Sequence, residues 1–260
     1  ALGLSEQTMV VAGSTDGYAS ALAAGAVDVG NWVSIIGTTM VLKGVTKSLV
    51  IDPSGSSYSH KLPSGNWMLG GAANIGGRCL NTFFDKKEFP EYEAYAEELT
   101  PTGILSYPLV GTGERFPFID PKAEAFIDGD VSDKKILFTA LMEGVGFAER
   151  LAFDRMQQIG CYVDSTIFTS GGACRSEQWL QIRSNILNRQ LKVPEVVDAA
   201  MGSAMIAAMT YFGTLEDSSK ALIRFSKTVE PQTEKAKRYE ELYHDFYSRC
   251  KSRYFMEGWR

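Results

Sequence analysis

Histidine and cysteine are scarce in this 260-residue sequence, which holds two His and four Cys. His60 and His244 have no partner residue at the spacing of a metal site or a catalytic triad. The cysteines match no zinc-binding pattern and are too few for a disulfide framework. Because no secretory signal pattern opens the chain, we expect a reducing, cytoplasmic setting.

Long apolar runs and an excess of basic residues are also missing. No stretch reaches the ~18 consecutive apolar residues that indicate a membrane-spanning helix. The 26 Lys and Arg residues are outnumbered by 31 Asp and Glu, which gives a formal net charge of −5. Nucleic-acid-binding domains usually carry a basic patch or stripe. We therefore expect neither a membrane nor a nucleic acid as a partner.

Apolar residues, by contrast, are plentiful at 45% of the chain. A chain of this length buries roughly 70–75% of its unfolded surface, which is enough for a hydrophobic core of its own. No linker rich in Gly, Pro or Ser divides the sequence, so we predict one domain over residues 1–260. The chain begins at Ala1 rather than at Met, and we expect it to be part of a longer protein.

Short β-type runs alternate with segments of helical periodicity, which predicts an α/β fold. The predicted strands are 8–12, 32–36, 40–45, 58–62, 67–69, 165–168 and 191–193, and the predicted helices are 18–26, 133–158, 176–187, 198–211 and one after Pro231. Ser132 is the expected N-cap of the long helix. The acidic segment 90–101 is predicted to be a solvated helix or an insertion, and 108–121 a loop.

Three glycine-containing turns follow apolar runs, at residues 13–17, 37–39 and 171–173. Glycine lets the backbone approach a ligand closely, and a strand-to-helix turn directs free N–H groups at anions. A single turn of this kind is usually structural. For three such turns together, a phosphate-binding site and a purely structural role are about equally expected.

Asp16 is the strongest single candidate for chemistry, because it follows the first predicted strand, where α/β folds place their sites. Its carboxylate can act as a general base toward a hydroxyl or hold Mg²⁺ bound to phosphates. Aspartate is also a good helix N-cap, and spacing alone favours that role for the helix 18–26.

Two other residues next to these motifs have structural interpretations. Cys174 follows a glycine turn but has no His nearby in the sequence, so we interpret it as structural. Arg115 either contacts a ligand or forms a buried pair with Glu114 that fixes the loop.

Taken in order, six motifs resemble the carboxy-terminal, nucleotide-binding half of the FGGY carbohydrate kinases, which are ATP-dependent sugar kinases of the actin/hexokinase/Hsp70 superfamily. They are 10–17 (VVAGSTDG), 25–27 with 36–39 (GAV, IGTT), 113–117 with 120–121 (GERFP, DP), 143–147 (EGVGF), 171–176 with Trp179 and Gln181 (GGACRS), and 201–204 (MGSA). Segments 37–45, 58–60 and 67–72 resemble the pentulose-kinase branch, such as D-ribulose kinase and xylulokinase.

The resemblance implies an actin-like, ribonuclease-H-like α/β domain with a mixed sheet and helices on both faces. It implies Asp16 as the general base, which reverses the preference for a cap, and ATP with Mg²⁺ as cofactors. The metal would be held by ATP phosphates and by carboxylates outside this chain, with Asp16 contributing through water. The implied nucleotide contacts are Gly37, Thr38 and Thr39 at the β- and γ-phosphates, Gly171, Gly172 and Ser176 at the adenosine, and Gly76 in the turn 74–77 that flanks the nucleotide. Ala173 departs from the third glycine of the family motif.

The implied function is the nucleotide-binding and catalytic-base half of a kinase that phosphorylates a pentulose, D-ribulose or D-xylulose. The sugar would bind through an amino-terminal domain that is absent from this chain. Because such kinases work by closing two domains, we expect the isolated chain to bind nucleotide weakly and to catalyse little. A homodimer is a further expectation. The alternative is a non-catalytic nucleotide-binding regulatory module of the same superfamily, which needs no Asp16.

Overall fold

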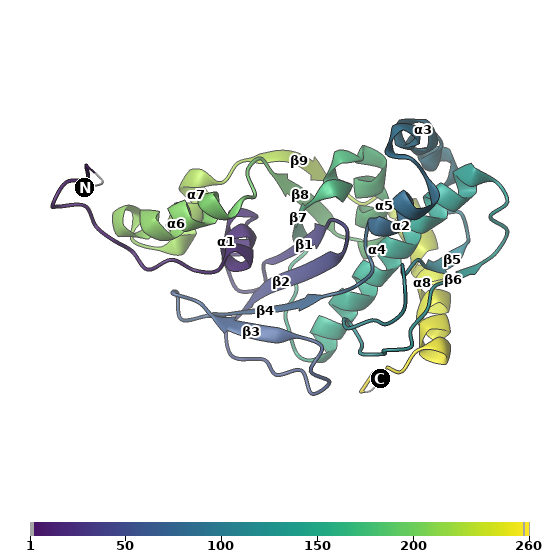
Figure 1. Ribbon diagram of the computed structural model, residues 1–260, viewed down its shortest axis with the longest axis horizontal. Coiled ribbons are helices and arrows are strands. Elements are labelled where there is room, and N and C mark those ends of the chain that lie inside the picture. Colours follow the sequence, from purple (N-terminus) through teal and green to yellow (C-terminus); the bar gives the residue numbers. More distant parts are fainter. Residues whose placement is uncertain (1–2, 257, 260) are drawn as a thin grey trace.

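A seven-stranded mixed β-sheet forms the centre of the fold (Figure 1). The structure is a computed structural model that describes residues 3–256 and 258–259. The strands of this sheet are β1 (Trp32–Ile36), β2 (Met40–Thr46), β3 (Tyr58–Lys61), β4 (Trp67–Ala72), β7 (Thr166–Ser170), β8 (Gln190–Pro194) and β9 (Phe225–Val229). Their order is β3-β4-β2-β1-β7-β8-β9, with β1, β7 and β8 parallel and the other neighbouring pairs antiparallel. A separate two-stranded sheet consists of β5 (Leu105–Tyr107) and β6 (Phe126–Asp128).

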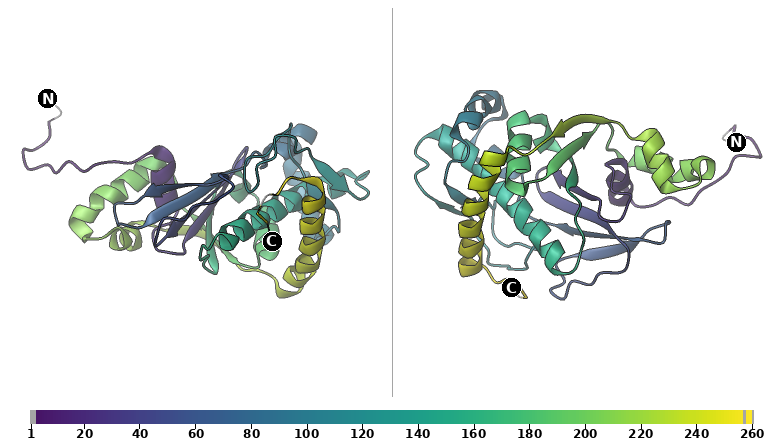
Figure 2. Two further views of the ribbon diagram at one scale, coloured as in Figure 1. Left: turned by 90° about the horizontal axis from the view of Figure 1, so that it is seen from below. Right: turned by 180° about the vertical axis from the view of Figure 1, so that it is seen from behind.

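Helices lie on both faces of the large sheet (Figure 2). One face carries α1 (Asp16–Ala23), α6 (Ala199–Phe212) and α7 (Leu215–Leu222). The other face carries α2 (Arg78–Phe83), α3 (Phe89–Leu99), α4 (Lys134–Gln158), α5 (Glu177–Leu187) and α8 (Thr233–Arg253), with the short 3-10 helices η1 (Lys86–Glu88) and η2 (Gly172–Arg175). The predicted α/β fold with a mixed sheet and helices on both faces is confirmed.

The two faces of the central strands contribute to two separate hydrophobic cores. Trp32 of β1 belongs to the core on the α4 and α5 side, whereas its neighbour Val33 belongs to the core on the α1 and α6 side. Along β2, Leu42 faces α4 and Val45 faces α1 in the same way. Successive side chains of a strand point to opposite faces. Lys43 therefore belongs to the row of β2 that faces α1.

The long helix α4 begins after Asp133, whose side chain accepts the N–H of Lys135 at 2.8 Å. The predicted N-cap at Ser132 is therefore wrong by one residue, because its neighbour is an equally good capping residue. Inside the protein, Glu149 of α4 forms a fully buried ion pair with Arg183 of α5 at 2.7 Å. This pair links the two helices that pack beneath β1 and β7.

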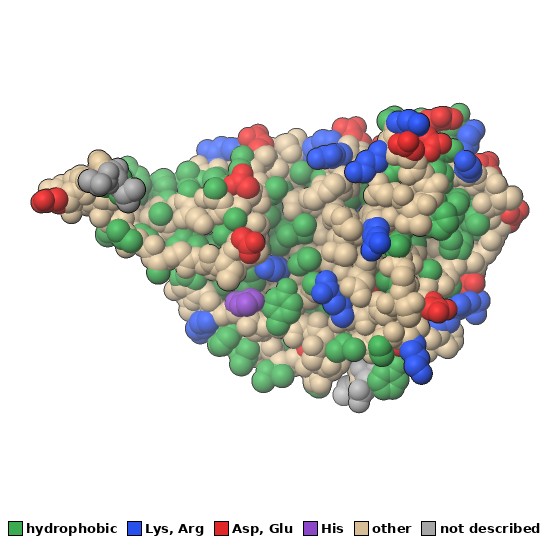
Figure 3. All heavy atoms as spheres, in the orientation of Figure 1, with side chains coloured by type: hydrophobic (Ala, Val, Ile, Leu, Met, Phe, Trp, Pro, Cys, Tyr) green, Lys and Arg blue, Asp and Glu red, His purple; other side chains and the backbone are tan. Residues whose placement is uncertain are grey.

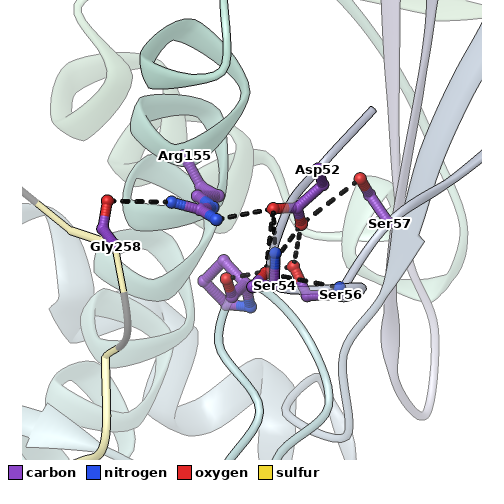
Figure 4. Close-up of polar contacts among 7 residues, drawn as sticks. Asp52, Ser54, Ser56, Ser57, Arg155 and Gly258 are labelled. Atoms are coloured by element: carbon purple, nitrogen blue, oxygen red, sulfur yellow. Dashed lines mark hydrogen bonds and ion pairs between the residues drawn. The ribbon is translucent and has the colours of Figure 1, made fainter. Parts of the chain in front are cut away.

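The loop between β2 and β3 is fixed by the buried carboxylate of Asp52 (Figure 4). It accepts hydrogen bonds from the hydroxyls of Ser54 and Ser56, at 2.9 Å and 2.6 Å. It also forms an ion pair with the buried guanidinium of Arg155 at 2.5 Å. The guanidinium in turn donates to the carbonyl of Gly258 at 3.4 Å. The Arg155 charge is thus neutralised within the chain.

Most predicted elements occur close to their expected positions. The predicted strand 32–36 coincides with β1, and the predicted helix 133–158 differs from α4 by one residue. The acidic segment 90–101 contains most of α3, so it is a helix rather than an irregular insertion. The short elements β5, β6, β9, α2 and α7 were not predicted from the sequence.

Residues 8–12 do not form the predicted strand. They are exposed, with Val10 91% accessible, and they have no pairing partner in the part of the chain that the structure describes. Figure 1 shows this segment leading away from the sheet toward the N-terminus. A strand requires a neighbouring strand to satisfy its N–H and C=O groups, so an apolar run is not sufficient by itself.

The described surface carries charges of both signs. On the face seen in Figure 3, acidic and basic side chains are interspersed among hydrophobic ones, without a continuous basic area. Within residues 3–256 and 258–259, no helix combines the length and the apolar character that crossing a bilayer requires.

Candidate functional site

A cavity of about 490 Å³ lies at the edge of the sheet where β1 and β7 end. The two strands are parallel neighbours, so the turns that follow them emerge side by side. Gly37 and Thr38 of the first turn line the cavity together with Gly172 and Ser176 beyond the second. The carboxyl ends of parallel strands are where open α/β sheets bind their ligands.

The opposite wall of the cavity comes from α2, η1 and α3. Apolar and charged side chains alternate along it, which is typical of a site for a small molecule that has both an apolar and an ionic part. This wall includes Leu80, Lys86, Phe89 and Glu93. Arg175 of η2 and Trp179 of α5 line the cavity as well.

The glycines of the site serve two different purposes. A Cβ atom added at Gly37 or Gly172 would meet no other atom within 4 Å, so both residues leave open space beside the backbone where a ligand can approach. At Gly171, which has a φ of +94°, a Cβ would lie 2.5 Å from the carbonyl oxygen of Ile36. At Gly76, a Cβ would lie 2.6 Å from the Cα of Thr39. The first pair opens the cavity, and the second pair lets its walls pack closely.

The turn 74–77 is joined to the β1–β2 turn by backbone hydrogen bonds. The N–H of Gly77 donates to the carbonyl of Gly37 at 2.8 Å, and the N–H of Arg78 donates to that of Thr38 at 3.1 Å. Gly77 also lines the cavity. The structure therefore places this turn beside Gly37 and Thr38, whereas Thr39 contributes its backbone to the contact with Gly76.

Glu114 holds the turn 74–77 from behind. Its buried carboxylate accepts the N–H of Asn74 at 2.6 Å, the N–H of Ile75 at 3.2 Å and the hydroxyl of Tyr107 at 3.0 Å. Burial raises the pKa of Glu114, and these hydrogen bonds oppose that effect. The predicted side-chain pair with Arg115 is wrong: Arg115 is exposed and donates only its backbone N–H, at 2.9 Å.

Ser176 caps α5 and orients one wall of the cavity. Its side-chain oxygen accepts the N–H of Trp179 at 3.1 Å, and its hydroxyl hydrogen-bonds to the carboxylate of Glu93. Burial raises the pKa of Glu93, and the bond to Ser176 lowers it. The indole N–H of Trp179 donates to the carbonyl of Met142 at 3.1 Å. The aromatic wall is thereby held by α4, α5 and α3 together.

Glu93 and Lys86 were not among the residues predicted from the sequence. Both lie about eighty residues before the glycine turn at Gly172, and no spacing connects them to it. The acidic composition of 90–101 indicated only a solvated face. Trp179 belongs to one of the six sequence motifs, and it reaches the cavity wall because it lies in the first turn of α5, the helix that Ser176 caps.

Asp16 is the first residue of α1 and does not line the cavity described above. Its carboxylate is exposed and accepts the N–H of Gly17 at 2.6 Å. Thr15 occupies the N-cap position without a side-chain hydrogen bond. The capping interpretation of Asp16 is therefore wrong: its carboxylate meets only the N–H of the next residue, which leaves one oxygen available to another partner. The general-base role stays a prediction.

A larger cavity, of about 760 Å³, lies near the loop between β2 and β3. Ile51, Ser54, Arg155 and Gly258 line it, and none of the predicted site residues does. Its buried cation, Arg155, is already paired with Asp52. The smaller cavity at the strand ends is the better candidate because glycine backbone, aromatic side chains and charged side chains converge there.

A nucleotide fits this smaller cavity in its chemistry. The open backbone at Gly37 and Gly172 suits phosphate groups, and the indole of Trp179 suits a base. Among residues 3–256 and 258–259, no three His, Cys, Asp or Glu side chains are grouped as a metal site. Mg²⁺ is commonly held by one or two carboxylates together with substrate phosphates, so Asp16 is compatible with a supporting role.

Comparisons with known proteins agree with this geometry. The model of the FGGY family of carbohydrate kinases, C-terminal domain, matches residues 32–211. The xylulose kinase of Bacillus subtilis (strain 168) is 27% identical over 266 residues, covering 96% of this chain and 52% of that protein. A gluconokinase of Bacillus licheniformis is 26% identical over 261 residues, covering 93% of this chain and 51% of that protein.

Solved structures show the same arrangement. The crystal structure of xylulose kinase from Rhodospirillum rubrum has a TM-score of 0.80 and 26% identity, and the match covers 92% of this chain and 50% of that one. The present chain spans about half the length of the curated relatives that it matches.

Proposed function

The chain belongs to the FGGY family of carbohydrate kinases, and from this membership we propose that it is the nucleotide-binding and catalytic-base half of an ATP-dependent sugar kinase. Its fold is the actin-like α/β fold of that family. The observation that best supports the proposal is the cavity at the ends of β1 and β7, where open glycine backbone faces an aromatic wall. Phosphoryl transfer depends on positioning and charge neutralisation, which such a cavity provides.

Each group of residues has a defined task in this proposal. The backbone of Gly37, Thr38 and Thr39 binds the β- and γ-phosphates, while Gly171, Gly172 and Ser176 position the adenosine. Gly76 keeps the flanking turn against the phosphate turn. Mg²⁺, when bound with ATP, neutralises charge on the phosphates.

The carboxylate of Asp16 accepts the proton of the sugar hydroxyl as that oxygen attacks the terminal phosphorus. The exposed position of Asp16 supports this role, because a base at the edge of the domain can reach a sugar held by another part of the protein. A positioned general base typically contributes ~10²–10⁴-fold to the rate.

The acceptor that we propose is a pentulose, D-ribulose or D-xylulose. Xylulose kinases are among the relatives, and the motifs of β2, β3 and β4 resemble the pentulose-kinase branch. A gluconokinase has similar identity to this chain, so a sugar acid is the competing acceptor. The sugar would bind to an amino-terminal half that, in this proposal, completes the enzyme, with residues 1–260 forming one domain.

The decisive experiment measures ADP formation by the protein that includes this proposed amino-terminal half. D-ribulose, D-xylulose and D-gluconate are offered in turn with ATP and Mg²⁺. We expect turnover with a pentulose, together with ATP binding that tightens when the pentulose is present. ATP binding that is indifferent to every sugar, with no turnover, would instead indicate the non-catalytic regulatory module, which family membership does not favour.

Two further points belong to the proposal. A cytoplasmic setting is supported by the thiols of Cys79, Cys161, Cys174 and Cys250, which are all free. The expected homodimer stays a prediction.

A further inference from the structure

Lys43 is a cation buried in the middle of the large sheet. It lies in β2, its side chain is only 7% exposed, and it points to the face covered by α1. Its aliphatic chain crosses Gly70 of β4, where an added Cβ would lie 3.1 Å from the Lys43 Cγ. Its ammonium reaches the first turn of α1, because a Cβ added at Gly17 would lie 2.9 Å from the Lys43 Nζ. The ammonium is therefore directed at the residue that follows Asp16.

This ammonium has no hydrogen-bond or ion-pair partner within residues 3–256 and 258–259. The two buried guanidinium groups differ in this respect, because Arg155 is paired with Asp52 and Arg183 with Glu149. Burial lowers the pKa of Lys43, and the negative charge of Asp16 opposes that effect. Buried charges are normally paired or hydrogen-bonded. The Lys43 Nζ is not among the fully enclosed atoms that lack a partner, so a partner from outside this chain can reach it.

The surroundings of the ammonium select an anion as that partner. The N-terminal end of a helix carries a partial positive charge, and the ammonium adds a full charge at the same place. Asp16 acts on Lys43 only through its charge: its carboxylate accepts the N–H of Gly17 and is not within ion-pair distance of the Lys43 ammonium. A base and a cation thus lie at the start of α1 without forming an ion pair in the part of the chain that the structure describes.

We propose that Lys43 is a second catalytic residue of this site, whose ammonium binds an oxygen of the phosphoryl group during its transfer to the sugar. This inference rests on the kinase function proposed above. In the reaction, the sugar oxygen forms a bond to the terminal phosphorus, and the bond from that phosphorus to the bridging oxygen breaks. ADP leaves with the electron pair, and the hydroxyl proton moves to Asp16. Lys43 stays protonated throughout and compensates the charge on the phosphoryl oxygens.

The main test replaces Lys43 by Met, which has a similar length and no charge. Replacing a buried charge by an apolar side chain of similar volume is often neutral or stabilising, so K43M should be at least as resistant to thermal unfolding as the wild type. Its kcat for the pentulose should fall roughly 10²–10³-fold, the usual effect of removing one group that stabilises transition-state charge. The KM for ATP should change little, because the nucleotide cavity does not include Lys43.

The matched control is Lys47→Met, which removes an exposed lysine just after the end of β2. It has the same change of charge and should alter neither kcat nor unfolding temperature. If K43M kept kcat within about tenfold of wild type, or lost stability and activity together, the proposal would be overturned and Lys43 would be structural.

A binding experiment separates this inference from the kinase function itself. Inorganic phosphate, a pentulose 5-phosphate and MgATP are added separately to the 260-residue chain, and the amide NMR signals of Asp16 and Gly17 are followed. A shift with either of the first two ligands that is lost in K43M supports an anion site at Lys43, even if no sugar is phosphorylated. If all three ligands leave these signals unchanged in the wild type, the anion site is refuted, whatever the protein phosphorylates.

Discussion

The buried carboxyl group of Glu143 predicts an unusual pH dependence of stability. Glu143 lies in α4, is 1% exposed and bonds to the backbone N–H of Thr102 at 3.1 Å and to the hydroxyl of Tyr239 at 2.7 Å. Its carboxylate also bonds to the hydroxyl of Thr102. Burial raises the pKa of Glu143 from 4.5 to about 7, against the lowering effect of these hydrogen bonds and of Lys235. The folded protein therefore holds a proton here that the unfolded chain releases near pH 4.5.

The direction in which stability changes with pH follows from this difference in proton binding. The contribution of Glu143 to stability is fully present below pH 4.5 and is lost as the pH rises through about 7. The two pKa values correspond to ~3 kcal/mol of unfolding free energy over that interval. Above pH 7 this group contributes no further change.

The assay is urea unfolding at pH values from 5 to 8, for the wild type and for Glu143→Gln. Glutamine resembles the protonated carboxyl group, so the variant should lack the loss of ~3 kcal/mol that Glu143 causes in the wild type. Glu98→Gln on the exposed side of α3 makes the same change of charge and should retain the wild-type dependence. Identical slopes for wild type and Glu143→Gln would refute the reasoning.

Three further changes test the site. Asp16→Asn should lower kcat by ~10²–10⁴-fold without altering MgATP affinity in calorimetry, and a loss below about tenfold would exclude the general base. Gly76→Ala should destabilise the fold by ~1–3 kcal/mol and weaken MgATP binding, because its Cβ would overlap the backbone of Thr39; unchanged affinity would show that the turn does not shape the nucleotide cavity. Trp179→Ala should cost ~3–5 kcal/mol in urea unfolding and reduce adenosine affinity, and a variant that kept full affinity would contradict the place of the indole in the cavity wall.

Elements with strong local patterns could be predicted from the sequence. The strand at Trp32–Ile36 is an apolar run ended by Gly37, and the helix Lys134–Gln158 has a long periodic face behind an acidic cap. The glycine turns could be located for the same reason, since glycine marks places where backbone must turn or approach closely. The short β5 and β6 have three residues each, which is too few for a recognisable period.

Features that depend on distant contacts could not be predicted. Residues 8–12 have the composition of a strand, but pairing, not composition, decides whether a strand forms. Glu93 lines the cavity together with Ser176, a residue far away in sequence whose hydroxyl donates a hydrogen bond to its carboxylate. Lys43 occupies a strand position where a charge usually marks the solvent side, and only the placement of α1 over that face buries it.

The buried cations of this domain differ in whether they are paired with a carboxylate, and this difference separates the structural cations from the one in the proposed site. Arg155 and Arg183 are each neutralised by a carboxylate from another element, so removing either partner would leave an uncompensated charge. Lys43 and Asp16 carry opposite charges at the start of α1 and are not joined in an ion pair. In the proposed kinase, these two groups act on a phosphoryl group and a hydroxyl only if something else positions the sugar between them. The 260-residue chain would therefore supply base, cation and nucleotide cavity, and would depend on a second half for turnover.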